Sequence, residues 1–158
     1  MINNHYTGVR HSYGYAQIVD SLTRSAGSSE KVLPKYGGFA KLCLEERENT
    51  ETSAEDLIKM EIHRLSEDEF CSGASFVQRV GGSHEDDGWI ISFVHNERTN
   101  TSQVHIIDTQ KFEGAPVAKI TLPQRVPYGF HGTFVHNNIH GHVNTRSEKK
   151  LDSLKFIY

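Results

Sequence analysis

The sequence has no long apolar run and no excess of basic charge, and each shortage excludes a class of protein. None of its apolar stretches approaches the roughly 18 residues that a membrane-spanning helix needs. Its 17 basic and 20 acidic side chains leave no surplus for the basic face of a nucleic-acid-binding protein. The length of 158 residues fits one domain. We therefore expect no transmembrane segment and no nucleic-acid partner.

Cysteines and targeting signals are also scarce. Cys43 and Cys71 lie far apart and form no Cys-x-x-Cys motif, so a zinc site through cysteine is not expected. Both are predicted to be reduced, buried and to behave as small apolar residues. Residues 1–5 contain neither a basic region nor an apolar core, and they do not have the Arg-rich and Ser-rich composition of a transit peptide. No targeting segment is therefore visible in the chain.

Short apolar stretches between turn residues predict an all-β chain without a strong helix. The run 89–95 (WIISFVH) is continuously apolar, which predicts a strand buried on both faces. The stretch 57–65 is ambiguous between helix and strand, and its alternation favours a strand. The other expected strands are 12–19, 39–44, 70–80, 104–108 and 116–122. The four strands between 70 and 122 match one propeller blade of about 40–45 residues.

Polar and turn-rich segments are expected to connect these strands. Residues 21–36 are predicted to be a loop, because glycine, serine and Pro34 interrupt any period. Residues 45–56 are predicted to form an exposed hairpin loop, although a capping pattern at 53–57 could also start a short helix. Residues 135–158 carry no core pattern and are predicted to be a polar tail.

The segment 125–134 (RVPYGFHGTF) places His131 among glycines and aromatic residues. Pro127 is expected to start an extended segment, and Gly129 and Gly132 remove side chains where a neighbour, ligand or metal could approach. Neutral imidazole is the commonest metal ligand among side chains. A single histidine among apolar residues is nevertheless more often a buried core residue. Spacing alone leaves both interpretations of His131 open.

Other polar residues have a structural and a functional interpretation. Glu85, Asp86 and Asp87 could form an acid–base pair, but the adjacent Gly88 favours a solvated turn. His95, on the buried run, is expected to be a structural core histidine. Arg125 is expected to anchor its turn by hydrogen bonding, with a role at a tunnel mouth as the alternative. A small chelating cluster or a polar tail would explain His136, His140 and His142.

Several motifs resemble the carotenoid cleavage dioxygenases, and above all RVPYGFHG at 125–132 and EDDGW at 85–89. Further similar stretches are SFVHNE at 92–97, ID at 107–108, PVA at 116–118 and LP at 122–123. Upstream stretches are similar to a plant branch that includes zaxinone-synthase-like enzymes, namely TGVRHSYGYAQIVDS at 7–21, LPKYGGFAKL at 33–42 and FCSGASFV at 70–77. The resemblance covers roughly residues 2–135.

The resemblance implies a seven-bladed β-propeller with a non-haem Fe(II) held on its axis by four histidines. Such enzymes use O₂ to cleave a conjugated double bond of a carotenoid or apocarotenoid into two carbonyl products, and an apolar tunnel delivers this substrate. Imidazole ligands with open positions suit iron of this kind. The last of the four ligands lies in the PYGFHG motif, so the resemblance assigns His131 as a metal ligand.

Two departures from the family pattern accompany this assignment. The other three histidine ligands belong to earlier blades, and seven blades need about 300 residues at roughly 40–45 each. Many relatives also carry a glutamate beside a ligand histidine, and Gly73 occupies that place here. Partners of this kind orient ligand imidazoles, so the glycine puts the orientation of the ligand in question.

We therefore expect residues 1–135 to be a C-terminal part of a carotenoid oxygenase propeller and residues 136–158 to be a tail outside the family. The expected class is an oxidoreductase by family, inactive as this chain alone, and located in the plastid or in the cytoplasm. The rival hypothesis is a non-catalytic β interaction module derived from the same family. Three in-frame histidine codons upstream would favour the enzyme, whereas a stop codon or promoter before Met1 would favour the module.

Overall fold

Strands make up nearly all the regular structure in the computed structural model of the chain. The structure describes residues 1–24, 32–44, 58–129, 132–135 and 155–157. Within these ranges a single 3-10 turn, η1 (Asn4–Tyr6), precedes nine strands. The strands are β1 (Tyr13–Arg24), β2 (Val32–Leu44), β3 (Ile58–Arg64), β4 (Glu69–Gln78), β5 (Gly88–Asn96), β6 (Thr101–Asp108), β7 (Ala118–Thr121), β8 (Thr133–Val135) and β9 (Lys155–Ile157). The predicted all-β class is confirmed, and no helix in the described ranges is long and apolar enough to cross a membrane.

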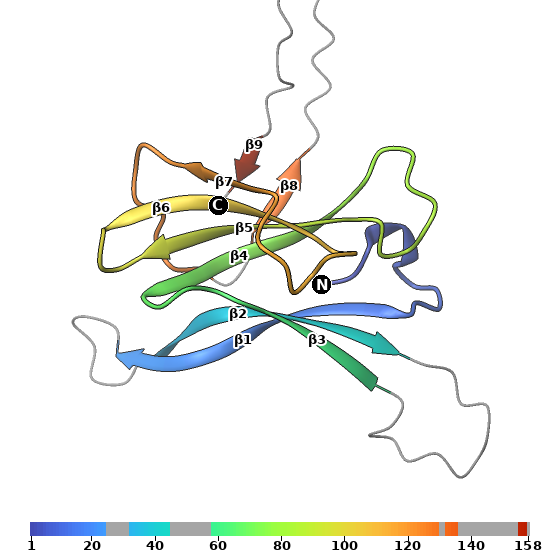
Figure 1. The fold of residues 1–158 in the computed structure, drawn as a ribbon, viewed down its shortest axis with the longest axis horizontal. Helices are drawn as coiled ribbons and strands as arrows, with labels where there is room; N and C mark the ends of the chain where they lie inside the picture. Colours follow the sequence, from blue (N-terminus) through green and yellow to red (C-terminus); the bar gives the residue numbers. More distant parts are fainter. Residues whose placement is uncertain (25–31, 45–57, 130–131, 136–154, 158) are drawn as a thin grey trace, which may run out of the picture.

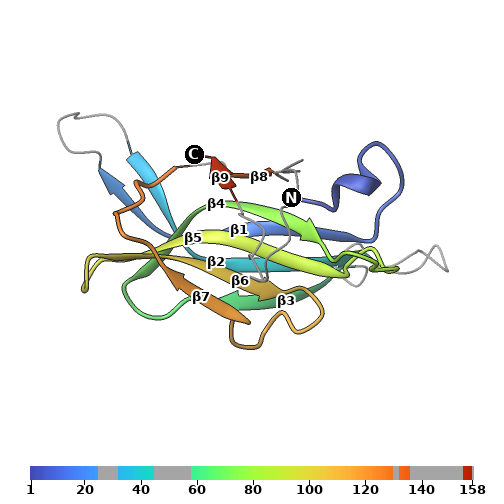
Figure 2. The same ribbon diagram turned by 90° about the horizontal axis from the view of Figure 1, so that it is seen from above.

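The strands form two antiparallel groups that lie one over the other. In the first group β2 pairs with β1 and β3, and in the second β4, β5, β6 and β7 pair in chain order. One bridge in the described residues, between Tyr36 and Cys71, joins the groups into a single sheet. Figure 1 shows β1–β3 as one layer and β4–β7 as the other, and Figure 2 gives the view from above. The four strands predicted between 70 and 122 are confirmed as β4–β7, which pair in chain order.

Large apolar side chains from both layers meet between them. Tyr15 on β1 and Phe39 on β2 pack with Phe76 on β4 and Ile90 on β5. The rings of Tyr15 and Phe76 stack with their centroids 5.4 Å apart. Burial of such side chains is the main favourable term that holds two sheets together.

Strand β5 is buried on both faces, as its continuous apolar run predicted. Ile90 and Val94 point into the core between the layers, whereas Ile91 and Phe93 join a second cluster on the other face of the sheet. Alternate residues of a strand point to opposite faces. The second cluster also contains Val77 and Val104 and is covered by residues that follow β7: Leu122, Val126 and Phe134.

The loop predicted at 21–36 is wrong at both of its ends. Strand β1 continues to Arg24 and β2 starts at Val32, so that Leu22 pairs with Pro34. Proline lacks the backbone N–H needed for a second ladder, and it is tolerated because β3 pairs with β2 only from Gly38 onward. The centre of this segment, the predicted hairpin loop at 45–56 and the alternative helix start at 53–57 lie outside the described residues.

Most of the polar tail predicted at 135–158 lies outside the described residues, and the structure adds a short strand within it. Lys155–Ile157 forms β9, which pairs with β8 in a separate two-stranded sheet. Ladder hydrogen bonds come from the backbone, so three residues can pair without the repeated apolar pattern on which the prediction relied.

Candidate functional site

The face of β4 that receives the segment 125–135 is interrupted by a β-bulge. Gly73 has a φ of 45°, and the register of β4 against β5 shifts between Ser72 and Ala74. The Ser92 hydroxyl lies 3.3 Å from the Ser72 carbonyl and 3.1 Å from the Gly73 carbonyl, so it caps the backbone groups that the bulge frees. A positive φ of this kind is much easier for glycine than for other residues.

Gly132 is packed directly against this bulge. A Cβ added to Gly132 would lie 3.1 Å from the carbonyl carbon of Gly73 and 3.3 Å from its Cα. The predicted clearance at Gly132 is therefore confirmed, and the neighbour is the backbone of Gly73. The structure thus places Gly73 beside Gly132 of the motif at 125–134.

Polar contacts hold the start of the motif on the sheet. The Ser72 hydroxyl lies 3.4 Å from the Pro127 carbonyl oxygen, and the Val126 amide donates to the Ser102 hydroxyl oxygen at 2.9 Å. Arg125 donates from Nε to His95 Nε2 at 3.3 Å. These contacts confirm the expected anchoring by Arg125. The prediction that His95 is a core residue is also confirmed, because this residue is only 5% exposed.

Tyr128 joins the motif to both layers of the sheet. Its hydroxyl donates to Glu97 Oε1 at 2.9 Å, and the same oxygen lies 2.6 Å from Lys35 Nζ. The ammonium group of Lys35 also lies 4.8 Å from the ring centroid of Phe70. The hydrogen bond from Lys35 lowers the pKa of Glu97, and burial followed by the bond to Glu97 raises the pKa of Tyr128. Sequence reasoning missed Lys35, Glu97 and Ser102, because nothing in their local pattern shows a partner so distant along the chain.

His131 lies outside the described residues, and so do His136, His140 and His142. Among the described residues, no group of three or more histidine, cysteine, aspartate or glutamate side chains could hold a metal ion. The described part of the chain thus does not fit an iron site by itself, and no step through iron is derived from it. The assignment of His131 as a ligand stays a prediction, and so does the chelating tail.

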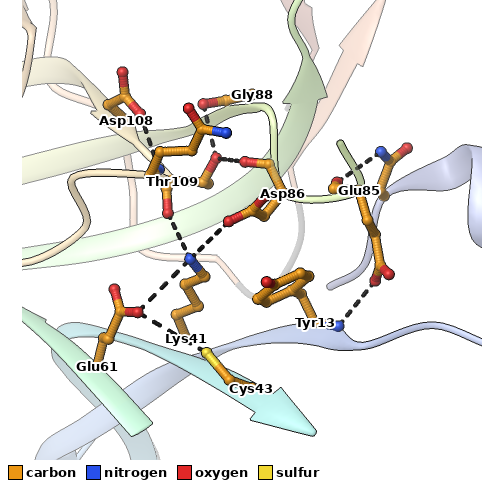
Figure 3. A network of polar contacts seen from close by, with 11 residues as sticks. Tyr13, Lys41, Cys43, Glu61, Glu85, Asp86, Gly88, Asp108 and Thr109 are labelled. Atoms are coloured by element: carbon orange, nitrogen blue, oxygen red, sulfur yellow. Dashed lines mark hydrogen bonds and ion pairs between the residues drawn. The ribbon is translucent and has the colours of Figure 1, made fainter. Parts of the chain in front are cut away.

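The acidic turn at 85–87 is neither an acid–base pair nor a solvated turn, which corrects the favoured interpretation. Its three acidic residues are half-buried and bind different partners. Figure 3 shows Glu85 beside Tyr13 and Asp86 beside Lys41. Glu85 accepts the amides of Ser12 and Tyr13 at 2.8 Å. Asp86 lies 3.0 Å from Lys41 Nζ, and Asp87 lies 2.6 Å from Nε of Arg79. The turn therefore ties β1 and β2 to the second layer.

The prediction of reduced and buried cysteines is confirmed in full for Cys71 but only in part for Cys43. Both cysteines are free thiols, and Cys71 is 1% exposed in the core. Burial raises the pKa of the Cys71 thiol to about 12, so it stays a thiol. Cys43 is only half-buried, and its Sγ lies 3.9 Å from Glu61 Oε1.

A family model described as retinal pigment epithelial membrane protein matches residues 1–136. The chain belongs to this family. Carotenoid 9,10(9′,10′)-cleavage dioxygenase 1 of Pisum sativum is 39% identical over 136 residues, which are 85% of this chain and 24% of that protein. The probable carotenoid cleavage dioxygenase 4, chloroplastic, of Arabidopsis thaliana is 34% identical over 140 residues, which cover 85% of this chain and 20% of that protein.

Solved structures in the same family share the fold of the chain. The cobalt-substituted apocarotenoid oxygenase of Synechocystis matches with a TM-score of 0.61 at 21% identity, over 84% of this chain and 24% of that one. The chain is thus an all-β part of the seven-bladed β-propeller of this family, and its sheet is not closed. It spans about a quarter of the length of the curated relatives that it matches. The matches do not select the zaxinone-synthase-like branch, which stays a prediction.

Proposed function

We propose that this chain supplies the C-terminal blades of a non-haem Fe(II) dioxygenase that cleaves a double bond of carotenoids or apocarotenoids. In the complete enzyme, bound iron would activate O₂ so that the double bond is converted into two carbonyl groups. His131 would donate one imidazole, and the other ligands would come from blades outside this chain. We further propose that the chain alone is inactive and that residues 136–158 lie outside the family domain.

The observation that carries this proposal is the seating of the PYGFHG motif on the β4 bulge. The contacts of Val126 with Ser102 and of Pro127 with Ser72 lead the backbone onto β4, and Gly132 lies against Gly73. The described backbone is therefore held at Val126 and Pro127 before His131 and at Gly132 after it. Close seating of this kind is what a metal ligand needs, because ligand geometry must be fixed by the residues around it.

The family relationship supports the substrate class and the compartment. Curated relatives are named as carotenoid cleavage dioxygenases, and some of them as chloroplastic. A plastid location is therefore part of the proposal, with the cytoplasm as the alternative. Carotenoid or apocarotenoid and O₂ are the proposed partners of the complete enzyme.

A chimera tests the proposal. Residues 1–136 of this chain would replace the matching stretch of the pea dioxygenase, and iron content and carotenoid cleavage would be measured after purification. We expect a chimera with iron and activity, and we expect His131→Ala to remove both while the protein stays folded. The control is His84→Ala, because this histidine is exposed in a turn.

Two outcomes would contradict the proposal. A His131→Ala chimera that keeps its iron and its cleavage activity would exclude the ligand role. A folded chimera that holds no iron and cleaves nothing would instead favour the non-catalytic β module.

The isolated chain should hold much less than one iron per molecule, because a single imidazole cannot replace a full ligand set.

A further inference from the structure

Ser102 accepts hydrogen bonds from two backbone amides of the segment that follows β7. Its carbonyl accepts from the Leu122 amide at 2.9 Å, and its side-chain oxygen accepts from the Val126 amide at 2.9 Å. Ser102 is only 2% exposed and faces His95 across the β5–β6 ladder. One residue thus fixes the end of β7 and also the start of the segment that leads to His131.

The contacts of His95 specify where its proton sits. Nδ1 lies 3.0 Å from the Ser102 hydroxyl oxygen, and Nε2 accepts from Nε of Arg125 at 3.3 Å. A guanidinium group has only donors, so Nε2 must carry the lone pair. In a neutral ring the proton is then on Nδ1 and is donated to Ser102. The Ser102 oxygen accepts this bond together with the bond from Val126.

Burial and Arg125 act against a second proton on the His95 ring, and Glu97 favours it. Arg125 lies on one side, Tyr128 meets the ring edge at a centroid distance of 6.0 Å, and Glu97 approaches from the β5–β6 turn. The Glu97 carboxylate is already engaged by Lys35 of β2 and by the Tyr128 hydroxyl. Burial first, and then Arg125, lower the pKa of His95, while Glu97 opposes them.

We propose that His95 and Ser102 are positioning residues for the segment that carries His131. Neutral His95 holds Arg125 through Nε2 and orients Ser102 through Nδ1–H, and Ser102 then holds Val126. A protonated ring would lose its acceptor for Arg125 and would place a second cation beside the guanidinium group. The arrangement therefore releases the segment in acid.

This inference rests on the proposed function in one respect: positioning the segment serves the enzyme only if His131 is a metal ligand. The hydrogen-bond relay itself needs no metal. The second anchor is the packing of Gly132 against the backbone of Gly73, and these backbone atoms do not titrate. Only the anchor at Val126 should therefore respond to pH.

Amide hydrogen exchange on the full 158-residue chain without metal tests the relay. The measured quantity is the ratio of the protection of the Val126 amide to that of the Leu122 amide. The Leu122 amide donates to the backbone carbonyl of Ser102, so this hydrogen bond remains when the Ser102 side chain is changed. Ser102→Ala should lower this ratio about fivefold, which corresponds to the net contribution of about 1 kcal/mol from a typical hydrogen bond. Thr101→Ala, which removes a neighbouring hydroxyl on the opposite face of β6, should leave it unchanged.

Two replacements of His95 separate its two bonds. His95→Asn keeps a donor near the Nδ1 position and removes the acceptor for Arg125, whereas His95→Gln keeps an acceptor near Nε2 and removes the donor. We expect each to lower the Val126 ratio less than Ser102→Ala does. We also expect that neither variant keeps the dependence of the ratio on pH.

The pH dependence distinguishes positioning by His95 from an ordinary buried hydrogen bond. In the unmodified chain the ratio should be constant above pH 6.5, the ordinary pKa of histidine, and should fall in more acidic solution. Arg125→Gln should weaken or abolish this fall, because the release depends on the lost acceptor for Arg125 and on repulsion between two cations. An unchanged ratio in Ser102→Ala, or a fall of full size in Arg125→Gln, would overturn the proposal.

The outcomes also separate this inference from the proposed function. If the ratio responds as expected while the His131→Ala chimera keeps its iron, the relay exists and the ligand assignment fails. If iron binding depends on His131 while the ratio is unchanged in the Ser102 and His95 variants, the ligand assignment stands and the relay is wrong.

Discussion

Gly132 lies against Gly73 so closely that a Cβ on Gly132 would be 3.1 Å from the Gly73 carbonyl carbon. The two residues are 59 positions apart in the sequence, and the contact joins the ligand motif to the β4 bulge. Neither glycine has a side chain that could keep the two backbones apart. The closeness of the motif to the sheet therefore depends on this pair.

Gly132→Ala should destabilise the chain by about 1–3 kcal/mol, because the added methyl group forces the backbones apart as overpacking does. The control is Gly14→Ala on β1, where an added Cβ has no neighbour within 4 Å. Denaturant unfolding of both variants measures the difference. Equal stability of the two variants would show that the motif can move away from β4 at no cost.

Lys41→Met should destabilise the chain far more than removal of an exposed cation does. Lys41 is 4% exposed, and its ammonium group lies 3.0 Å from Asp86 Oδ2 and 2.8 Å from the Thr109 carbonyl oxygen (Figure 3). Its loss leaves the half-buried Asp86 carboxylate without its cation, at a cost of up to about 3–5 kcal/mol.

The matched control for Lys41 is Arg98→Met. The Arg98 side chain is 77% exposed and lies 3.7 Å from Asp68, so its loss should cost less than about 1 kcal/mol. Urea unfolding of the two variants at one pH gives the comparison. Similar small losses in both would mean that the buried ion pair contributes no more than a surface pair.

His105 should make the chain less stable in acid. Burial first, and then Lys119, lower its pKa from 6.5 to about 4. The folded state therefore binds fewer protons than the unfolded state between these values. Stability is highest above pH 6.5 and falls as the pH decreases toward 4, by up to about 3 kcal/mol for this residue.

The variant His105→Leu isolates this contribution from those of other histidines. The Nδ1 atom of His105 is buried and has no hydrogen-bond partner among the described residues, whereas Nε2 lies 3.2 Å from Gln103 Oε1. Leucine therefore removes the bond to the half-buried Gln103, a loss that does not depend on pH in this range. Free energies of unfolding for both proteins between pH 4 and pH 7 give the comparison. Parallel pH profiles would show that His105 does not titrate between the two states.

The all-β class could be predicted from local patterns, because strand period and turn residues are encoded within a few neighbouring positions. The run 89–95 predicted a strand buried on both faces, and β5 is one. The loop predicted at 21–36 was wrong at both of its ends, since pairing between β1 and β2 outweighed the serine and proline signals there. The family relationship was also visible in the sequence, because RVPYGFHG and EDDGW are specific motifs.

The sequence by itself determined that the chain is built from strands and that Arg125 to Phe134 is its distinctive segment. Only the tertiary structure decided where that segment lies and what holds it. Ser102 and Val126 are 24 positions apart and Lys35 and Glu97 are 62 apart, so no local pattern predicts either contact. The acidic turn shows the same limit, because its carboxylates looked solvated until Lys41 and Arg79 were placed beside them. Hydrogen bonds and ion pairs depend on distances in space, and folding sets these distances through the packing of the two layers.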